Sequence, residues 1–140
     1  MSFREKTAWV TLCAIIVVSL MYWLHVPSLF EPHPGLWVVH AMAVSLGAYL
    51  LIEVVAHVVL RMRYPRDARL PKDEREQLID LKAIRIAYYV FATGALGGIP
   101  LMLHLAGAGP VAMAMAVFMA FVLSQIVKHA ARIAYYRRGV

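Results

Sequence analysis

The chain has 140 residues, of which 62% are hydrophobic and 16% charged, and its formal net charge is +6. This composition excludes a soluble globular domain of such a length and predicts an integral membrane protein. Because lipid cannot satisfy open backbone groups, the spanning elements are expected to be helices. We therefore expect an all-α membrane protein that forms a single domain over residues 1–140.

Four apolar segments are long enough to cross a bilayer, which takes about 20 residues per helix. They cover roughly residues 7–24, 37–60, 84–105 and 110–131. A polar stretch, residues 61–83, separates the first two from the last two. The expected architecture is two transmembrane hairpins joined by one long loop.

The basic residues predict the orientation of these hairpins. All 14 Lys and Arg residues fall in three stretches that four spans would place on one side: the N-terminus, the central loop with Arg85, and the tail from Lys128. By the positive-inside rule, both termini and the central loop are expected to be cytoplasmic. The charge thus follows topology, so we expect contact with anionic lipid headgroups and no binding of nucleic acid.

Several candidate metal ligands gather toward the opposite face. They are His25, Glu31, His33, His40 and His104, with Met21, Met42 and Met102 at similar depth. Imidazole, carboxylate and thioether groups could form a zinc or copper site. The spacing matches no metal motif, however, and methionine is a common packing residue. We therefore expect no metal and no other cofactor.

The second segment holds the one acidic residue inside any predicted span, Glu53, and His57 follows it at i+4. Glu53 lies about 12 Å along the helix from Arg61, where an ionisable group costs about 2.5–3.5 kcal/mol. It should therefore face the bundle interior and find a partner. One interpretation is a proton- or cation-coupling carboxylate with His57 as relay; the other is a structural hydrogen bond that fixes helix packing.

The central stretch predicts a helix that starts in the cytoplasm. Asp73 is followed three residues later by Glu76, which resembles a capping box with acids in the first turn. No proline or glycine interrupts the chain from there into the third span. The charged start, Asp73, Glu74, Arg75 and Glu76, is the candidate surface for a partner protein. The alternative is a solvated collar that enforces topology.

Small residues predict helix-packing faces in the second hairpin. Gly94 and Gly98 have the G-x-x-x-G spacing, and Ala112, Ala116 and Ala120 form a stripe at i+4 spacing. Such residues let two helices approach closely in lipid.

A weak internal repeat relates the second and fourth segments. Glu53, His57 and Arg61 correspond to Gln125, His129 and, one residue early, Arg132. Each half has two spans, so the halves would be parallel repeats about an axis along the membrane normal. The repeat predicts a polar intramembrane cluster of Glu53, His57, Gln125, Lys128 and His129. Histidines on two helices could also ligate a b-type haem, which nothing else in the sequence supports.

Several short motifs carry a resemblance. They are Asp73-Glu74-Arg75-Glu76, Leu78-Ile79, Lys82-Ala83, Arg85-Ile86-Ala87-Tyr88-Tyr89, Tyr135-Tyr136-Arg137-Arg138-Gly139 and the start SFREKTAW. In these motifs the chain resembles a group of small, uncharacterised bacterial four-span proteins and, more loosely, the family called domain of unknown function 2178. The resemblance covers most of the chain. It implies four helices in a bacterial inner membrane and brings no known activity, substrate or catalytic residue.

Three functions follow from these observations. The leading hypothesis is a non-enzymatic accessory, regulatory or assembly subunit, in a homo-oligomer or a larger membrane complex. The first alternative is a small ion- or proton-coupled transporter or channel that uses Glu53. The second is a haem- or metal-binding protein that uses His57 and His129. No nucleophile constellation or phosphate loop suggests catalytic residues.

Overall fold

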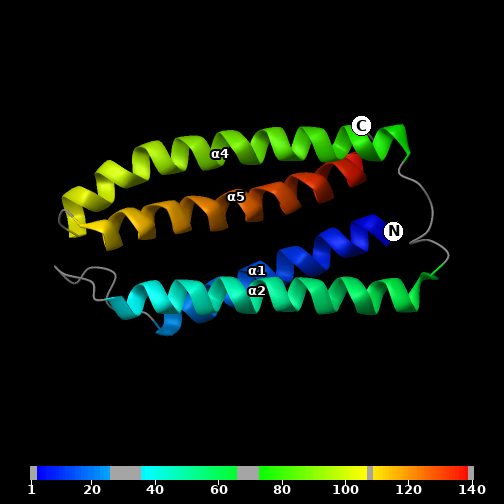
Figure 1. Ribbon diagram of the computed structural model, residues 1–140. Helices are drawn as coiled ribbons and strands as arrows, with labels where there is room; N and C mark the ends of the chain where they lie inside the picture. The colour runs from blue at the N-terminus through cyan, green and yellow to red at the C-terminus, as the bar shows by residue number, and fades with distance from the viewer. Residues whose placement is uncertain (1–2, 26–35, 66–72, 107–108, 139–140) are drawn as a thin grey trace.

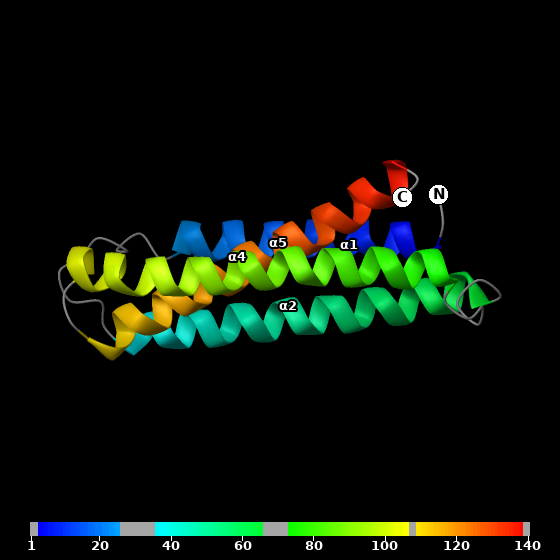
Figure 2. The ribbon, with the colours of Figure 1, turned by 90° about the horizontal axis from the view of Figure 1, so that it is seen from above.

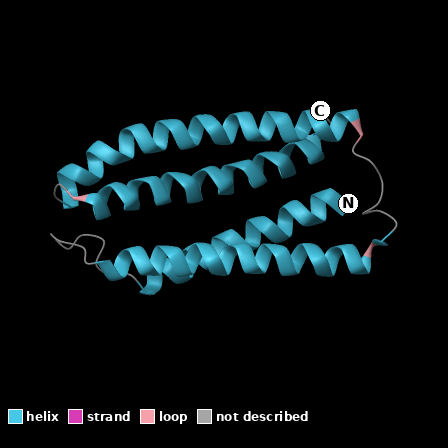
Figure 3. Ribbon diagram, in the orientation of Figure 1, coloured by secondary structure: helices cyan, strands magenta, loops and turns pink. Residues whose placement is uncertain are grey.

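The computed structural model describes residues 3–25, 36–65, 73–106 and 109–138, which form long helices (Figure 1). These are α1 (Phe3–His25), α2 (Leu36–Arg63), α4 (Glu74–Ala106) and α5 (Pro110–Arg138). Each is long and apolar enough to cross a membrane. Within the described ranges there is no strand (Figure 3). The predicted all-α architecture with four candidate spans is thus confirmed.

The local sequence explains where helices begin and end. The Asp73 carboxylate accepts a hydrogen bond from the backbone N–H of Glu74 at 2.7 Å, and its carbonyl accepts one from Gln77 at 3.0 Å. Asp73 therefore caps α4, because its side chain satisfies a donor that the helix leaves open. At the end of α5, Arg137 and Arg138 occupy the last turn, where the helix dipole favours cations.

The helices extend beyond the segments that hydropathy predicts. α5 continues to Arg138 and α2 to Arg63, past the last apolar residues. Nothing in these charged ends breaks a helix, so the backbone stays helical after the membrane-like sequence stops. α4 is unbroken across Pro100, and its ribbon curves in the C-terminal third (Figure 1). Proline loses a backbone donor and crowds the preceding turn, which accounts for the bend.

Both chain ends lie at one end of the bundle, together with the end of α2 and the start of α4 (Figure 1). We call this the charged end, because every Lys and Arg among the described residues lies in the helix segments nearest to it. The opposite end is called the apolar end. The side of the membrane that each end faces, and the internal repeat, stay predictions.

α5 is the central helix of the arrangement. It packs most extensively on α4, and it also contacts α1 and, over a shorter stretch, α2. Seen from above, α5 crosses the bundle diagonally, from the start of α2 at the apolar end to the start of α1 at the charged end (Figure 2). α1, α2 and α4 therefore all contact the same helix, α5.

Two kinds of packing hold α5 in place. At the apolar end, Tyr22, Val38, Met42 and Met115 from three helices form a buried cluster, on which Phe118 packs. The rings of Tyr22 and Phe118 lie 5.2 Å apart between centroids. This cluster joins α1, α2 and α5.

Along α4, by contrast, glycine allows close approach to α5. A Cβ built on Gly94 would lie 3.1 Å from the Cβ of Ala120, and one on Gly98 would lie 3.7 Å from that of Ala116. Ala112, in the same stripe, is also buried. In lipid, such close contact replaces the hydrophobic driving force of water.

Large apolar side chains face outward on α2 and α4. Val44 is 71% exposed, Leu51 65% and Leu96 77%. In water such surfaces would drive aggregation, whereas lipid tails solvate them. The burial pattern is that of a bundle surrounded by lipid.

Candidate functional site

The charged end is tied together by ion pairs between helices. Among the described residues, Arg132 Nε of α5 lies 2.9 Å from Asp80 Oδ1 of α4, and Arg4 Nε of α1 lies 2.8 Å from Glu76 Oε2 of α4. These four side chains are mostly buried, with about a fifth or less of each exposed. Mostly buried pairs are screened less by salt than surface pairs. They therefore fasten α4 to both α1 and α5.

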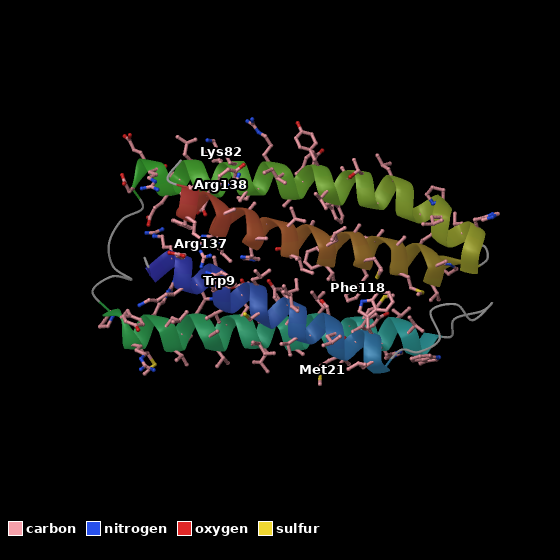
Figure 4. The ribbon with its side chains drawn as sticks, turned by 180° about the vertical axis from the view of Figure 1, so that it is seen from behind. Trp9, Met21, Lys82, Phe118, Arg137 and Arg138 are labelled. Carbon is pink, nitrogen blue, oxygen red and sulfur yellow. The ribbon has the colours of Figure 1, made fainter. Side chains whose placement is uncertain are left out.

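Cations also stack on aromatic rings at this end. The Arg137 guanidinium lies 5.3 Å from the centre of the Trp9 ring and 3.7 Å from the Glu5 carboxylate (Figure 4). Lys6 lies 4.2 Å from the centre of the Tyr64 ring. Each such contact contributes roughly 0.5–1 kcal/mol at exposed sites. The last turn of α5 is thus bound to the first turns of α1.

Glu53 lies at the edge of the packed face of α2. It is partly exposed, and the Tyr49 hydroxyl one turn earlier is within hydrogen-bonding range of its carboxylate. His57 Nδ1 donates to the backbone carbonyl of Glu53 at 2.7 Å when it carries the proton. Among the described residues Glu53 has no ion pair. Tyr49, Glu53 and His57 therefore form a polar row at i+4 spacing.

His129 of α5 is 4% exposed, and its Nδ1 has no hydrogen-bond partner among the described residues. His57, Asp80, Lys128 and Arg132 are its electrostatic neighbours. His57 of α2 therefore lies within electrostatic range of His129 of α5. The ion-paired Asp80 and Arg132 border the same polar region.

The remaining members of the predicted cluster lie on another face. Gln125 and Lys128 line a groove beside Tyr88 of α4. The partner described for Glu53 is Tyr49, not Gln125 or Lys128. The five residues predicted to form one cluster are thus distributed between a polar row on α2, the buried His129 and a groove along α4.

The predicted partner surface is only partly available. Asp73, Glu74 and Arg75 are exposed, but Asp73 caps α4. Glu76 is engaged by Arg4. The start of α4 therefore presents fewer free groups than its sequence suggests.

The candidate metal ligands at the apolar end do not gather into a site in the described part of the chain. Glu31 and His33 lie outside the described residues, as do the side chains of His25 and Met102. Met42 belongs to the buried apolar cluster, whereas Met21 points outward (Figure 4). His40 and His104 are exposed. Within the described ranges, no group of three or more His, Cys, Asp or Glu side chains could hold a metal ion.

Sequence reasoning missed Asp80 as a partner of Arg132. Asp80 belongs to a charged stretch whose sequence is typical of a solvent-exposed segment. It nevertheless shares a helix face with Ala83, Ala87 and Gly94, which follow it at successive spacings of three, four and seven residues. Ala83 and Ala87 are buried. Asp80 lies on the same face as these small residues, which pack against α5. That position is the signal that could have identified Arg132 of α5 as its partner.

The comparisons with known proteins identify one family. Residues 4–140 match the family model described as "Predicted membrane protein (DUF2178)". This match confirms the resemblance derived from the short motifs. No curated protein and no solved structure matches the chain.

Proposed function

Because the chain belongs to the DUF2178 family of predicted membrane proteins, we propose that it acts inside the bilayer as a non-enzymatic accessory subunit. In this role it regulates or assembles other membrane components through helix contacts. The proposal includes a homo-oligomer or a larger complex as the working state, with both termini on the cytoplasmic side of a bacterial inner membrane. The concentration of described cations at the charged end supports that orientation.

One observation carries the proposal: α2 holds a membrane-level carboxylate without a cation. Glu53 has no ion pair among the described residues. Such a group costs about 2.5–3.5 kcal/mol at the centre of a spanning helix, so a donor from outside would stabilise it. α2 also has surface to offer, since 6% of its span is buried, as in α4, against 28% for α5.

The contact surface is the face of α2 on either side of Glu53. Ile52 and Val54 lie about 100° to either side of it around the helix, and Leu50 lies between Glu53 and Val54; each is at least two-fifths exposed. Apolar side chains around one polar group are typical of helix contacts in lipid, where the polar group fixes the register. A second copy of the chain or a different membrane subunit could supply the donor.

The test is recovery of the assembly from membranes. Tagged protein extracted in a mild detergent is expected to elute as a discrete species larger than one chain. Glu53→Ala should reduce that species severalfold, because its donor contact is lost. Leu96→Ala, which truncates an exposed side chain of α4 with the same replacement, is the control. A monodisperse single chain without any co-purifying membrane protein would overturn the proposal.

A second candidate is an ion- or proton-coupled transporter, favoured by the polar row on α2. Tyr49, Glu53 and His57 lead along one face toward His129. Purified protein in liposomes with an imposed pH gradient is then expected to conduct protons, and Glu53→Gln should abolish the flux. Equal flux in both forms would remove the carboxylate from any such mechanism. Haem or metal binding through His57 and His129 stays a prediction that no described contact favours.

A further inference from the structure

A groove runs along α5 between α2 and α4, and we call it the α2–α4 groove. Its outer part is a cavity of about 530 Å³ that Met42, Leu46, Phe118 and other apolar side chains line. Its inner part, about 360 Å³, is bordered by Tyr88, Gln125 and Lys128. Phe91 and Phe121 line both parts, so the two parts adjoin at these rings.

The chemistry changes along this groove. The outer part is lined by apolar side chains, whereas the inner part ends at the cation of Lys128. About 22 Å of helix separates Lys128 from Met113, the lining residue of α5 farthest from it, which is about three quarters of the ~30 Å hydrocarbon core of a bilayer. The groove therefore runs from the level of Lys128 past the middle of the membrane.

A second cation lies at the depth of Lys128. Gly94 faces Ala120 and Gly98 faces Ala116. Continuing this antiparallel register brings Lys128 level with residue 86 of α4, next to the exposed Arg85. Neither Lys128 nor Arg85 has an ion pair among the described residues, and the nearby Asp80 is held by Arg132.

We propose that the α2–α4 groove binds a phospholipid with an anionic headgroup. The phosphate lies between Lys128 and Arg85, and one acyl chain follows Phe91 and Phe121 toward Met42. Two cations without carboxylate partners complement the phosphate, and the aromatic and aliphatic lining complements the chain. Cations near a membrane surface favour anionic lipid by roughly fivefold each. A small phosphate alone would leave the apolar length of the groove unused.

The test is lipid binding to delipidated, detergent-solubilised protein, followed by native mass spectrometry. The probes are dioleoyl phosphatidylglycerol and dioleoyl phosphatidylcholine, which share acyl chains and differ in headgroup charge. With two cations, wild type is expected to prefer phosphatidylglycerol roughly twenty-five-fold. Lys128→Gln should lower that preference roughly fivefold, and Lys128→Gln with Arg85→Gln should abolish it.

Arg138→Gln is the matched control, because it removes the same charge from an exposed side chain in the last turn of α5. It should leave the preference unchanged, and circular dichroism should show equal helicity for all variants. Water-soluble glycerophosphoglycerol should not compete with the lipid. Equal binding of the two lipids, an equal loss in Arg138→Gln, or competition by the free headgroup would each overturn the proposal.

Discussion

α2 and α5 are almost equal in length and hydropathy, yet they differ in how much of each is packed against other helices. They have 28 and 29 residues, and their spans have mean hydropathies of 2.0 and 2.1. α5 nevertheless contacts all three other described helices, and 28% of its span is buried. Only 6% of the α2 span is buried. Both helices are apolar enough to lie in lipid, so hydropathy does not decide which of them packs against the other helices. Side-chain size does: α5 presents an alanine stripe to the glycines of α4, whereas α2 presents branched side chains to lipid.

The strongest test of this contrast is a truncation in the cluster that anchors α5. Met115 is 1% exposed among side chains from α1 and α2. Met115→Ala is expected to lower the free energy of unfolding by about 2 kcal/mol, the low end for buried methionine, because lipid removes the water-transfer part of the cost. Denaturant titration followed by helicity in dodecyl maltoside measures it. A loss below about 0.5 kcal/mol would show that the cluster does not hold α5.

The glycine contact should give an effect of comparable size. A Cβ added at Gly94 would lie 3.1 Å from the Cβ of Ala120, so the side chain of Gly94→Leu would clash with Ala120. We expect the free energy of unfolding to fall by about 1–3 kcal/mol. Gly97→Leu is the matched control on the same helix, because nothing lies within 4 Å of its Cβ position. The same denaturant titration compares them. Because leucine has a higher helix propensity than glycine, equal losses would mean that contact with α5 at Gly94 does not set the cost.

Breaking the ion pair between α4 and α5 should cost less. Asp80→Asn leaves Arg132 mostly buried without its carboxylate, and we expect a loss of about 1–2 kcal/mol, between the values for exposed and buried pairs. Thermal unfolding in detergent at low and high salt measures it. Glu74→Gln, which removes an exposed carboxylate of the same helix, should change stability by less than about 0.5 kcal/mol. A control as harmful as Asp80→Asn would assign the effect to overall charge.

The smallest effect is expected on the outward face of α2. Leu51 is 65% exposed, so Leu51→Ala should change the stability of a single chain by less than about 0.5 kcal/mol. Unfolding in detergent, where the chains are diluted, isolates this value. A loss comparable with that of Met115→Ala would place α2 inside the packed core and remove the contrast.

The sequence predicted the helices well because membrane insertion is a local property. Twenty apolar residues in a row are needed wherever they later pack, and Asp73 caps α4 through its immediate neighbours. Its hydrogen bond to Glu74 depends on nothing distant in the chain. The existence of the helices and the start of α4 were therefore accessible from residue patterns alone.

The pairing of side chains between helices was not accessible in the same way. Glu53 and Lys128 have compatible charges and depths, yet rotation about the helix axes turns Lys128 toward the α4 side of α5. Asp80 and Arg132 meet because the register of Gly94 and Ala120 brings them level. The rotation of each helix and the register between helices depend on packing between segments far apart in the chain. The residue pattern within one segment does not reveal that packing.

The central position of α5 also bears on how the bundle is built. A chain is synthesised from its N-terminus, so α1, α2 and α4 reach the membrane before the helix that all three contact. Until then, α4 lacks its small-residue partner, and the acids Glu5 and Asp80 lack Arg137 and Arg132. α1 and α2 contact each other and can pack before α5 is made, whereas α4 gains its packing partner and its ion pair with Arg132 once α5 has been inserted.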